Sequence, residues 1–148
     1  MPGFLPDTSC MIAAVCTWHE HHDRATSEIE QRLRRGEEML MAGPALIESY
    51  AVLTRLPAPH RLSPLDAFTL LETNFMRAKI IALDGAAYRT LLRRAADDEI
   101  VGGQTYDAVI AGCVLKSKAD ALLTFNEGHF LWLAERGIAV VVPGAERG

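Results

Sequence analysis

The chain reads Glu38-Met39-Leu40-Met41-Ala42-Gly43-Pro44-Ala45-Leu46-Ile47-Glu48 over residues 38–48, and this stretch indicates the class of fold. Residues 38–42 form a short apolar run that is typical of a buried strand. Gly43 and Pro44 then open a helix, because proline suits the first helical position. A strand that passes directly into a helix is the unit from which α/β proteins are built.

The same alternation continues along the rest of the chain. Further strands are predicted at residues 3–6, 79–83, 121–125 and 138–142. Helices are predicted to begin at residue 11, to cover residues 21–35 and 85–97, to begin after Ser63, and to contain Asp107. Strands separated by helices imply parallel pairing, so we expect an α/β fold: a three-layer α/β/α sandwich on a central parallel sheet, with residues 1–148 as one domain.

Hydrophobic spacing predicts which side chains face the core. In the helix at residues 21–35 the stripe is Ala25, Ile29 and Leu33, and Gly36 is the expected stop. The helix at residues 85–97 is expected to point Tyr88, Leu91 and Leu92 inward. Trp132, with Leu131 and Leu133, is expected in the core, with a partner-binding surface as the alternative.

The composition is that of an ordinary globular protein. Of 148 residues, 49% are hydrophobic and 23% charged, and the net charge of −4 argues weakly against tight duplex binding without excluding an RNA-cleaving enzyme. The three cysteines form no CxxC pair and are interpreted as small buried hydrophobes in a reducing compartment. We see no run long enough for a transmembrane helix and no signal peptide, so no membrane association and a cytoplasmic location are expected.

Three carboxylates stand in apolar surroundings: Asp7 after the first strand, Glu48 within an apolar helix, and Asp107 in a similar one. Such placement is costly unless something pairs with the charge, and no lysine or arginine lies within these segments. A divalent metal would explain all three. Each acid also has a simpler interpretation: Asp7 as a helix cap, Asp107 as a first-turn acid, and Glu48 on a solvent-facing stripe.

Hard cations such as Mg²⁺ or Mn²⁺ prefer oxygen ligands, which Asp7, Glu48 and Asp107 would provide. Asn126 follows the strand at 121–125 and adds a neutral oxygen, while Ser9 and Thr124 are placed to orient a carboxylate or a water. Such a site suits phosphodiester hydrolysis by a metal-activated water, with either one ion or two.

Four segments, in this order, resemble the PIN-domain ribonucleases and in particular the VapC-type toxins of bacterial toxin–antitoxin pairs. They are Asp7-Thr8-Ser9 after a short apolar strand, residues 44–57 around Glu48, residues 102–111 around Asp107, and residues 119–130 around Asn126.

The resemblance implies a metal-dependent endoribonuclease that cuts single-stranded regions of structured RNA, is silenced by a small antitoxin and forms a homodimer. It makes Asp7 and Asp107 the magnesium ligands, with Glu48 completing an acidic triad. The fourth position is often aspartate in the family and is Asn126 here, which puts a second metal in question.

The alternative functions are a binding module and a phosphatase. Asn126 in place of an acid would suit a PIN-like module that binds RNA or a protein without cutting. A phosphatase of the haloacid-dehalogenase type needs a second aspartate two residues after the first, where this chain has Ser9.

The histidine-rich segment at residues 19–23 lacks a partner cluster that would complete a zinc shell. We therefore expect a solvated loop or helix start there, with a role in substrate binding left open. His129 is interpreted as structural.

Overall fold

The strands lie side by side in the order β3-β2-β1-β4-β5, and every neighbouring pair is parallel. The computed structural model describes residues 2–145. The strands are β1 (Gly3–Pro6), β2 (Glu38–Ala42), β3 (Lys79–Ile81), β4 (Ala121–Leu123) and β5 (Ala139–Val141). The central strands β1 and β4 are buried along their whole length, as expected when both faces of a parallel sheet are covered.

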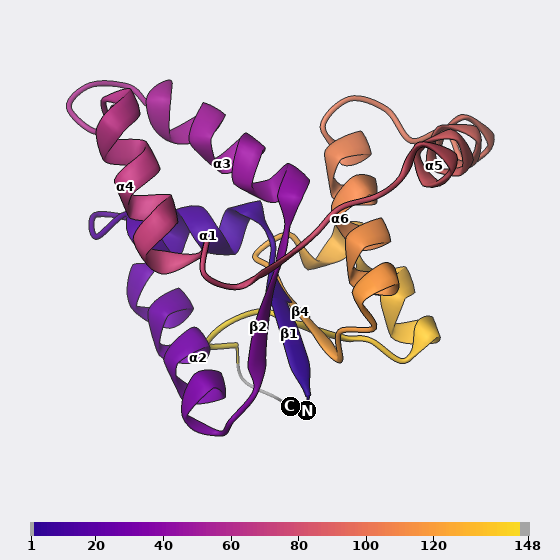
Figure 1. The fold of residues 1–148 in the computed structure, drawn as a ribbon, viewed down its shortest axis with the longest axis horizontal. Helices are drawn as coiled ribbons and strands as arrows, with labels where there is room; N and C mark the ends of the chain where they lie inside the picture. The colour runs from indigo at the N-terminus through magenta and orange to yellow at the C-terminus, as the bar shows by residue number, and fades with distance from the viewer. Residues whose placement is uncertain (1, 146–148) are drawn as a thin grey trace.

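Helices cover both faces of this sheet, which confirms the predicted three-layer arrangement (Figure 1). On the left of the view lie α1 (Thr8–Val15), α2 (His22–Arg34), α3 (Gly43–Thr54) and α4 (Pro64–Asn74). On the right lie α5 (Gly85–Asp97), α6 (Gln104–Ser117) and the short 3₁₀ helices η1 (Glu127–His129) and η2 (Leu131–Arg136). None of the helices in residues 2–145 has both the length and the apolar character needed to cross a membrane.

Several predicted boundaries are confirmed. Strands β1 and β2 and helix α5 have the predicted bounds, and the side chain of Ser63 accepts a hydrogen bond from the Asp66 amide at the start of α4. Helix α1 begins at Thr8 rather than at residue 11, because Asp7 caps it. The cysteines are free and buried, as predicted.

Some predicted core positions are wrong. Leu33 is 47% exposed and Arg32 is buried in its place. Tyr88, Leu92 and Trp132 are also exposed, Leu92 by 61%. Tyr88 and Leu92 are exposed because of the position of α5. This helix stands at the outer edge of the molecule and packs on α6, so part of its apolar stripe is left uncovered (Figure 1).

Arg32 anchors α2 against the sheet. Its guanidinium lies 2.8 Å from Glu37 and 3.4 Å from Glu28, and its Cζ atom lies 5.9 Å from the centre of the Phe4 ring in β1. All three charged side chains are largely buried. Their ion pairs therefore offset the hydration that each of them loses on burial.

We expect Arg32→Ala to lower the free energy of unfolding by about 3 kcal/mol, because it leaves the mostly buried Glu28 without a cation and leaves Glu37 with only the more exposed Arg35, 3.1 Å away. Urea denaturation followed by circular dichroism measures this. Arg34→Ala is the matched control: Arg34 lies two residues along the same helix, is exposed, and is 4.0 Å from Glu30, so its removal should change stability by less than about 0.5 kcal/mol. Equal losses in the two variants would contradict the buried-network account.

Candidate active site

The acidic site lies where β1 and β4 end. Pro6 pairs with Leu123 in the parallel register, and the Asp7 amide then donates to the Leu123 carbonyl at 2.9 Å. This register brings Asp7 and Thr124, the first residues beyond the two strands, side by side. The carboxyl edge of a parallel sheet is where ligand sites form in such folds.

Asp7 is both a helix cap and a buried carboxylate. Its Oδ1 accepts from the Cys10 amide at 2.9 Å and from the Ser9 hydroxyl at 2.6 Å, and its Oδ2 accepts from the Thr124 hydroxyl at 2.6 Å. The side chain is closed off from solvent, with 1% exposed. The simple interpretation as a cap is therefore correct, but it does not account for the burial.

The two hydroxyl groups are themselves held by the backbone after β4. The Phe125 amide donates to Ser9 Oγ at 3.0 Å, and the Asn126 amide donates to Thr124 Oγ1 at 2.9 Å. Each hydroxyl is thus oriented to donate its own proton to Asp7. Ser9 and Thr124 thus both donate to the Asp7 carboxylate, and their supporting role in a metal site stays a prediction.

Burial raises the pKa of Asp7 to about 6, and the negative charge of Asp107 adds to this, while the three hydrogen bonds act in the opposite direction. Within residues 2–145, no lysine, arginine or histidine nitrogen lies within 4.0 Å of this carboxylate. The Asp7 carboxylate is therefore a buried charge that lacks a cationic side-chain partner in the described chain.

Asp107 lies in the first turn of α6, with its side chain only partly exposed. Its Oδ2 is 2.6 Å from Nδ1 of His129, a residue of η1. Sequence reasoning missed this contact and left His129 as a structural residue. The only available signal was that His129 comes soon after Thr124 and Asn126, which themselves follow β4, so a short turn can return it to the same edge.

Glu48 and Asn126 are less closely tied to the site. Glu48 is partly exposed in α3, where its neighbour Ser49 is buried and donates to the Met11 sulfur at 3.7 Å. Asn126 is exposed. Among the described residues no group of three or more His, Cys, Asp and Glu side chains is placed to hold a metal ion. The structure thus relates Asp7 to Asp107 but does not draw Glu48 into a tight triad with them.

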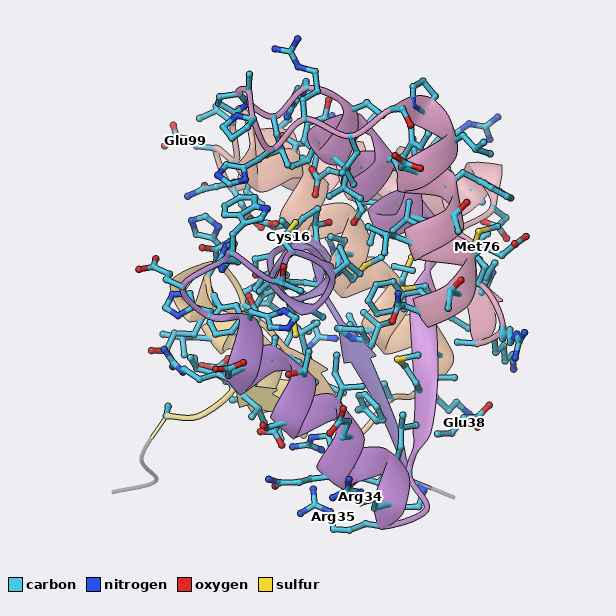
Figure 2. All side chains as sticks on the ribbon, turned by 90° about the vertical axis from the view of Figure 1, so that its left-hand side faces the viewer. Cys16, Arg34, Arg35, Glu38, Met76 and Glu99 are labelled. Carbon is cyan, nitrogen blue, oxygen red and sulfur yellow. The ribbon has the colours of Figure 1, made fainter. Side chains whose placement is uncertain are left out.

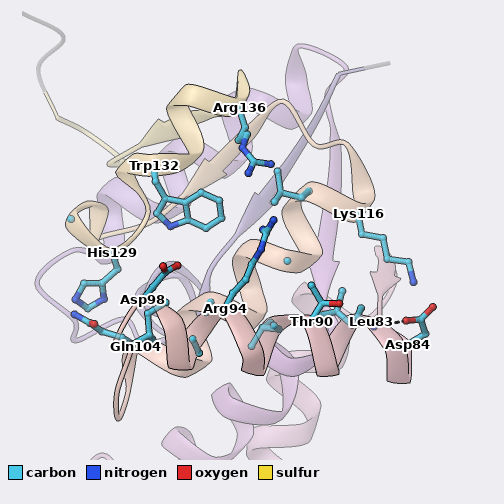
Figure 3. Close-up of a pocket in the computed structure, with 18 residues that line it drawn as sticks. Leu83, Asp84, Thr90, Arg94, Asp98, Gln104, Lys116, His129, Trp132 and Arg136 are labelled. Atoms are coloured by element: carbon cyan, nitrogen blue, oxygen red, sulfur yellow. Dashed lines mark hydrogen bonds between the residues drawn. The ribbon is translucent and has the colours of Figure 1, made fainter.

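A hollow of about 880 Å³ opens beside this site, between α5, α6 and η2 (Figure 3). His129 forms part of its wall, so the hollow reaches the side of Asp107. Arg94 and Arg136 point into it from opposite walls, and Trp132 lies beside them (Figure 3). The exposed Trp132 side chain therefore lines a cavity instead of the core.

Known proteins match most of this chain. The PIN domain matches residues 4–134. Ribonuclease VapC40 of Mycobacterium tuberculosis is 39% identical over 119 residues, which are 80% of this chain and 83% of that protein.

Solved structures share the fold at lower identity. VapC20 of Mycobacterium tuberculosis, described as a sarcin–ricin loop cleaving toxin, superposes with a TM-score of 0.67 at 15% identity and covers 95% of this chain and 99% of its own. DNA-bound VapBC from Salmonella typhimurium gives a TM-score of 0.65 at 21% identity, over 95% of this chain and 98% of its own. By its domain match and its relatives, the chain belongs to the PIN-domain family.

Proposed function

We propose that this protein is a Mg²⁺- or Mn²⁺-dependent endoribonuclease, acting as one PIN domain and as the toxin of a toxin–antitoxin pair. The observation that carries the proposal is the buried Asp7 carboxylate, which lies within the electrostatic influence of Asp107 and has no cationic side chain from residues 2–145 beside it. A divalent cation would compensate both charges. The relative named Ribonuclease VapC40 supports RNA as the substrate class.

The available oxygen atoms fit a hard cation. Asp7 Oδ2 accepts one hydrogen bond and so retains a lone pair, and Asp107 is partly open to solvent. Mg²⁺ commonly uses one or two carboxylates and keeps several waters, so two aspartates suffice. When bound, the ion supplies Lewis-acid polarisation of the phosphoryl oxygen and lowers the pKa of a coordinated water.

The other side chains have supporting roles in this proposal. Ser9 and Thr124 hold the Asp7 carboxylate in one orientation, and His129 does the same for Asp107. Glu48 and Asn126 would contact water molecules around the ion and the RNA phosphate, because the structure does not group them tightly with the two aspartates.

A small protein antitoxin is the proposed partner, and a homodimer the proposed assembly. Support for the partner comes from the PIN-domain relatives solved as VapBC complexes. The apolar side chains left open on α5, with the adjoining hollow, provide a surface that a partner chain would cover.

The burial of Asp7 predicts an unusual stability effect. We expect Asp7→Asn to raise the free energy of unfolding by about 2 to 3 kcal/mol at pH 8 in chelator, because it removes a buried charge, and one pKa unit corresponds to about 1.4 kcal/mol. Between about pH 4 and 6 the folded wild type binds more protons at Asp7 than the unfolded chain does, so its stability falls as the pH rises through this window. The advantage of Asp7→Asn should therefore grow from pH 4 to pH 6 and stay constant above.

Urea unfolding across this pH range measures the effect, and thermal unfolding with added Mn²⁺ should show stabilisation of the wild type but not of Asp7→Asn. Asp84→Asn is the matched control, because Asp84 also caps a helix, accepting from the Ala87 amide at 2.8 Å, but is exposed. It should be nearly neutral, since Asp and Asn cap helices equally well. A loss of stability in Asp7→Asn at pH 8 would contradict the account.

The proposed activity is tested by incubating purified protein with total cellular RNA in Mg²⁺, in Mn²⁺ and in chelator. We expect cuts at discrete positions that need the metal and fall at least a hundredfold in Asp107→Asn, since that variant weakens a charged metal ligand. Glu48→Gln should reduce the rate less if Glu48 acts through water.

A second candidate function is RNA or protein binding without cutting, which the exposed Asn126 and the lack of a three-acid group in residues 2–145 favour. Folded wild-type protein that binds RNA but leaves it intact in both metals would support that function. Cleavage that persists equally in Asp107→Asn would contradict the proposed nuclease site.

A further inference from the structure

Five aromatic and imidazole rings form a continuous series on the surface, which we call the ring series: Phe125, His21, His19, Trp18 and His60. Successive ring centroids lie 4.5, 5.6, 5.9 and 4.0 Å apart. The first and last pairs are stacked and the two between are tilted. Three separate parts of the chain contribute to it, residues 18–21, His60 and Phe125, so the tertiary fold assembles the series.

One end of the ring series reaches the acidic site. Phe125 directly follows Thr124, and its amide donates to the Ser9 hydroxyl that holds Asp7. The series then passes the C-terminal end of α1 near Cys16, labelled in Figure 2, and ends at His60 in the connection between α3 and α4. The rings therefore lead away from the carboxylates along the surface on the α1 side of the sheet.

A hydrogen bond and burial favour the neutral form of His19. Nδ1 of His19 accepts from the His21 amide at 3.0 Å, and Nδ1 of His21 lies 3.0 Å from an Arg24 guanidinium nitrogen, which can only donate. Burial lowers the pKa of His19, and the neighbouring His21 and His22 add to this. A neutral ring in a fixed orientation can stack without the energetic cost of removing water from a charged group.

The charges around the ring series are mixed. Arg24 lies 5.5 Å from the Phe125 centroid, and its Nε is fixed by a 2.8 Å bond to the Pro143 carbonyl. Arg61 follows His60 and is exposed, while the acids Glu20 and Asp23 lie in the same segment as the histidines. A partner would thus be held mainly by its stacking faces, with few phosphate contacts.

We propose that the ring series is a stacking platform for unpaired nucleobases of an RNA strand, which it leads into the Asp7–Asp107 site. This inference rests on the proposed endoribonuclease function. Trp18 stacks on His60 and is still 48% exposed, which suits single-stranded bases, because every base has a π-face whereas paired bases hide theirs. An RNA strand fits better than a protein here because the platform starts at the residue whose amide supports the catalytic pocket.

The experiment uses Trp18 as its own probe. The Trp132→Phe variant leaves Trp18 as the only tryptophan, and Asp107→Asn in the same chain prevents cutting. Titration with short oligoadenylate should quench Trp18 fluorescence, and changing the salt concentration should shift the Kd only slightly, since few phosphates are neutralised. Binding of labelled oligoadenylate, measured by anisotropy, should weaken about tenfold in Trp18→Ala and recover in Trp18→Phe, which keeps a stacking face.

Tyr88→Ala is the matched control, because Tyr88 is an exposed aromatic residue on α5, on the opposite side of the sheet (Figure 1). It should leave the Kd unchanged. Circular dichroism of Trp18→Ala checks that the half-exposed side chain is not needed for folding.

The outcomes separate the two proposals. Metal-dependent cleavage by the wild type, without Trp18 quenching and with the same Kd in Trp18→Ala, would overturn the platform and leave the nuclease in place. Trp18 quenching by RNA with no cleavage in either metal would keep the platform and overturn the nuclease. Loss of binding to a co-expressed protein partner in Trp18→Ala, with RNA binding unchanged, would make the ring series a protein interface and overturn the proposal.

Discussion

Much of the site depends on one buried carboxylate. Asp7 ends β1, caps α1 through the Cys10 amide and receives the hydroxyl of Thr124, which follows β4. One side chain therefore fixes how the first helix leaves the sheet and how the two central strands meet at their carboxyl ends. Because each donor is itself positioned by the backbone, the carboxylate has a single orientation.

This arrangement has an electrostatic cost that a structural cap would not require. An exposed aspartate such as Asp84 caps α5 equally well, so capping alone does not explain the burial of Asp7. The three hydrogen bonds only partly offset the loss of water, and the Asp107 charge makes ionisation harder. The ionised Asp7 carboxylate is unfavourable at this site unless a cation is present. The site is therefore well suited to binding a cation.

Two different surfaces extend from the acidic site. The ring series runs from Phe125 over the α1 side of the sheet and consists of flat rings. The hollow beside His129 lies between α5, α6 and η2 and carries arginines and an exposed tryptophan. We assign the first to the RNA strand and the second to a partner chain, and both surfaces end at groups that hold the two aspartates.

The amino-acid sequence by itself determined the alternation of strands and helices, most helix starts and the three acids, because these follow from local spacing and capping preferences that neighbouring residues specify. The bounds of β1, β2 and α5 were predictable in this way. The exposure of apolar residues on α5 was not predictable. The hydrophobic pattern marks an apolar stripe on a helix, but it does not say whether another element covers that stripe.

Only the tertiary structure decided which side chains meet. The contact of His129 with Asp107 and the ring series depend on the register of β1 and β4 and on turns that return distant residues to one edge. Burial and charge at Asp7 are likewise properties of its surroundings, which include Thr124, 117 residues further along the chain. Long-range packing sets such distances, and no local pattern of residues encodes them.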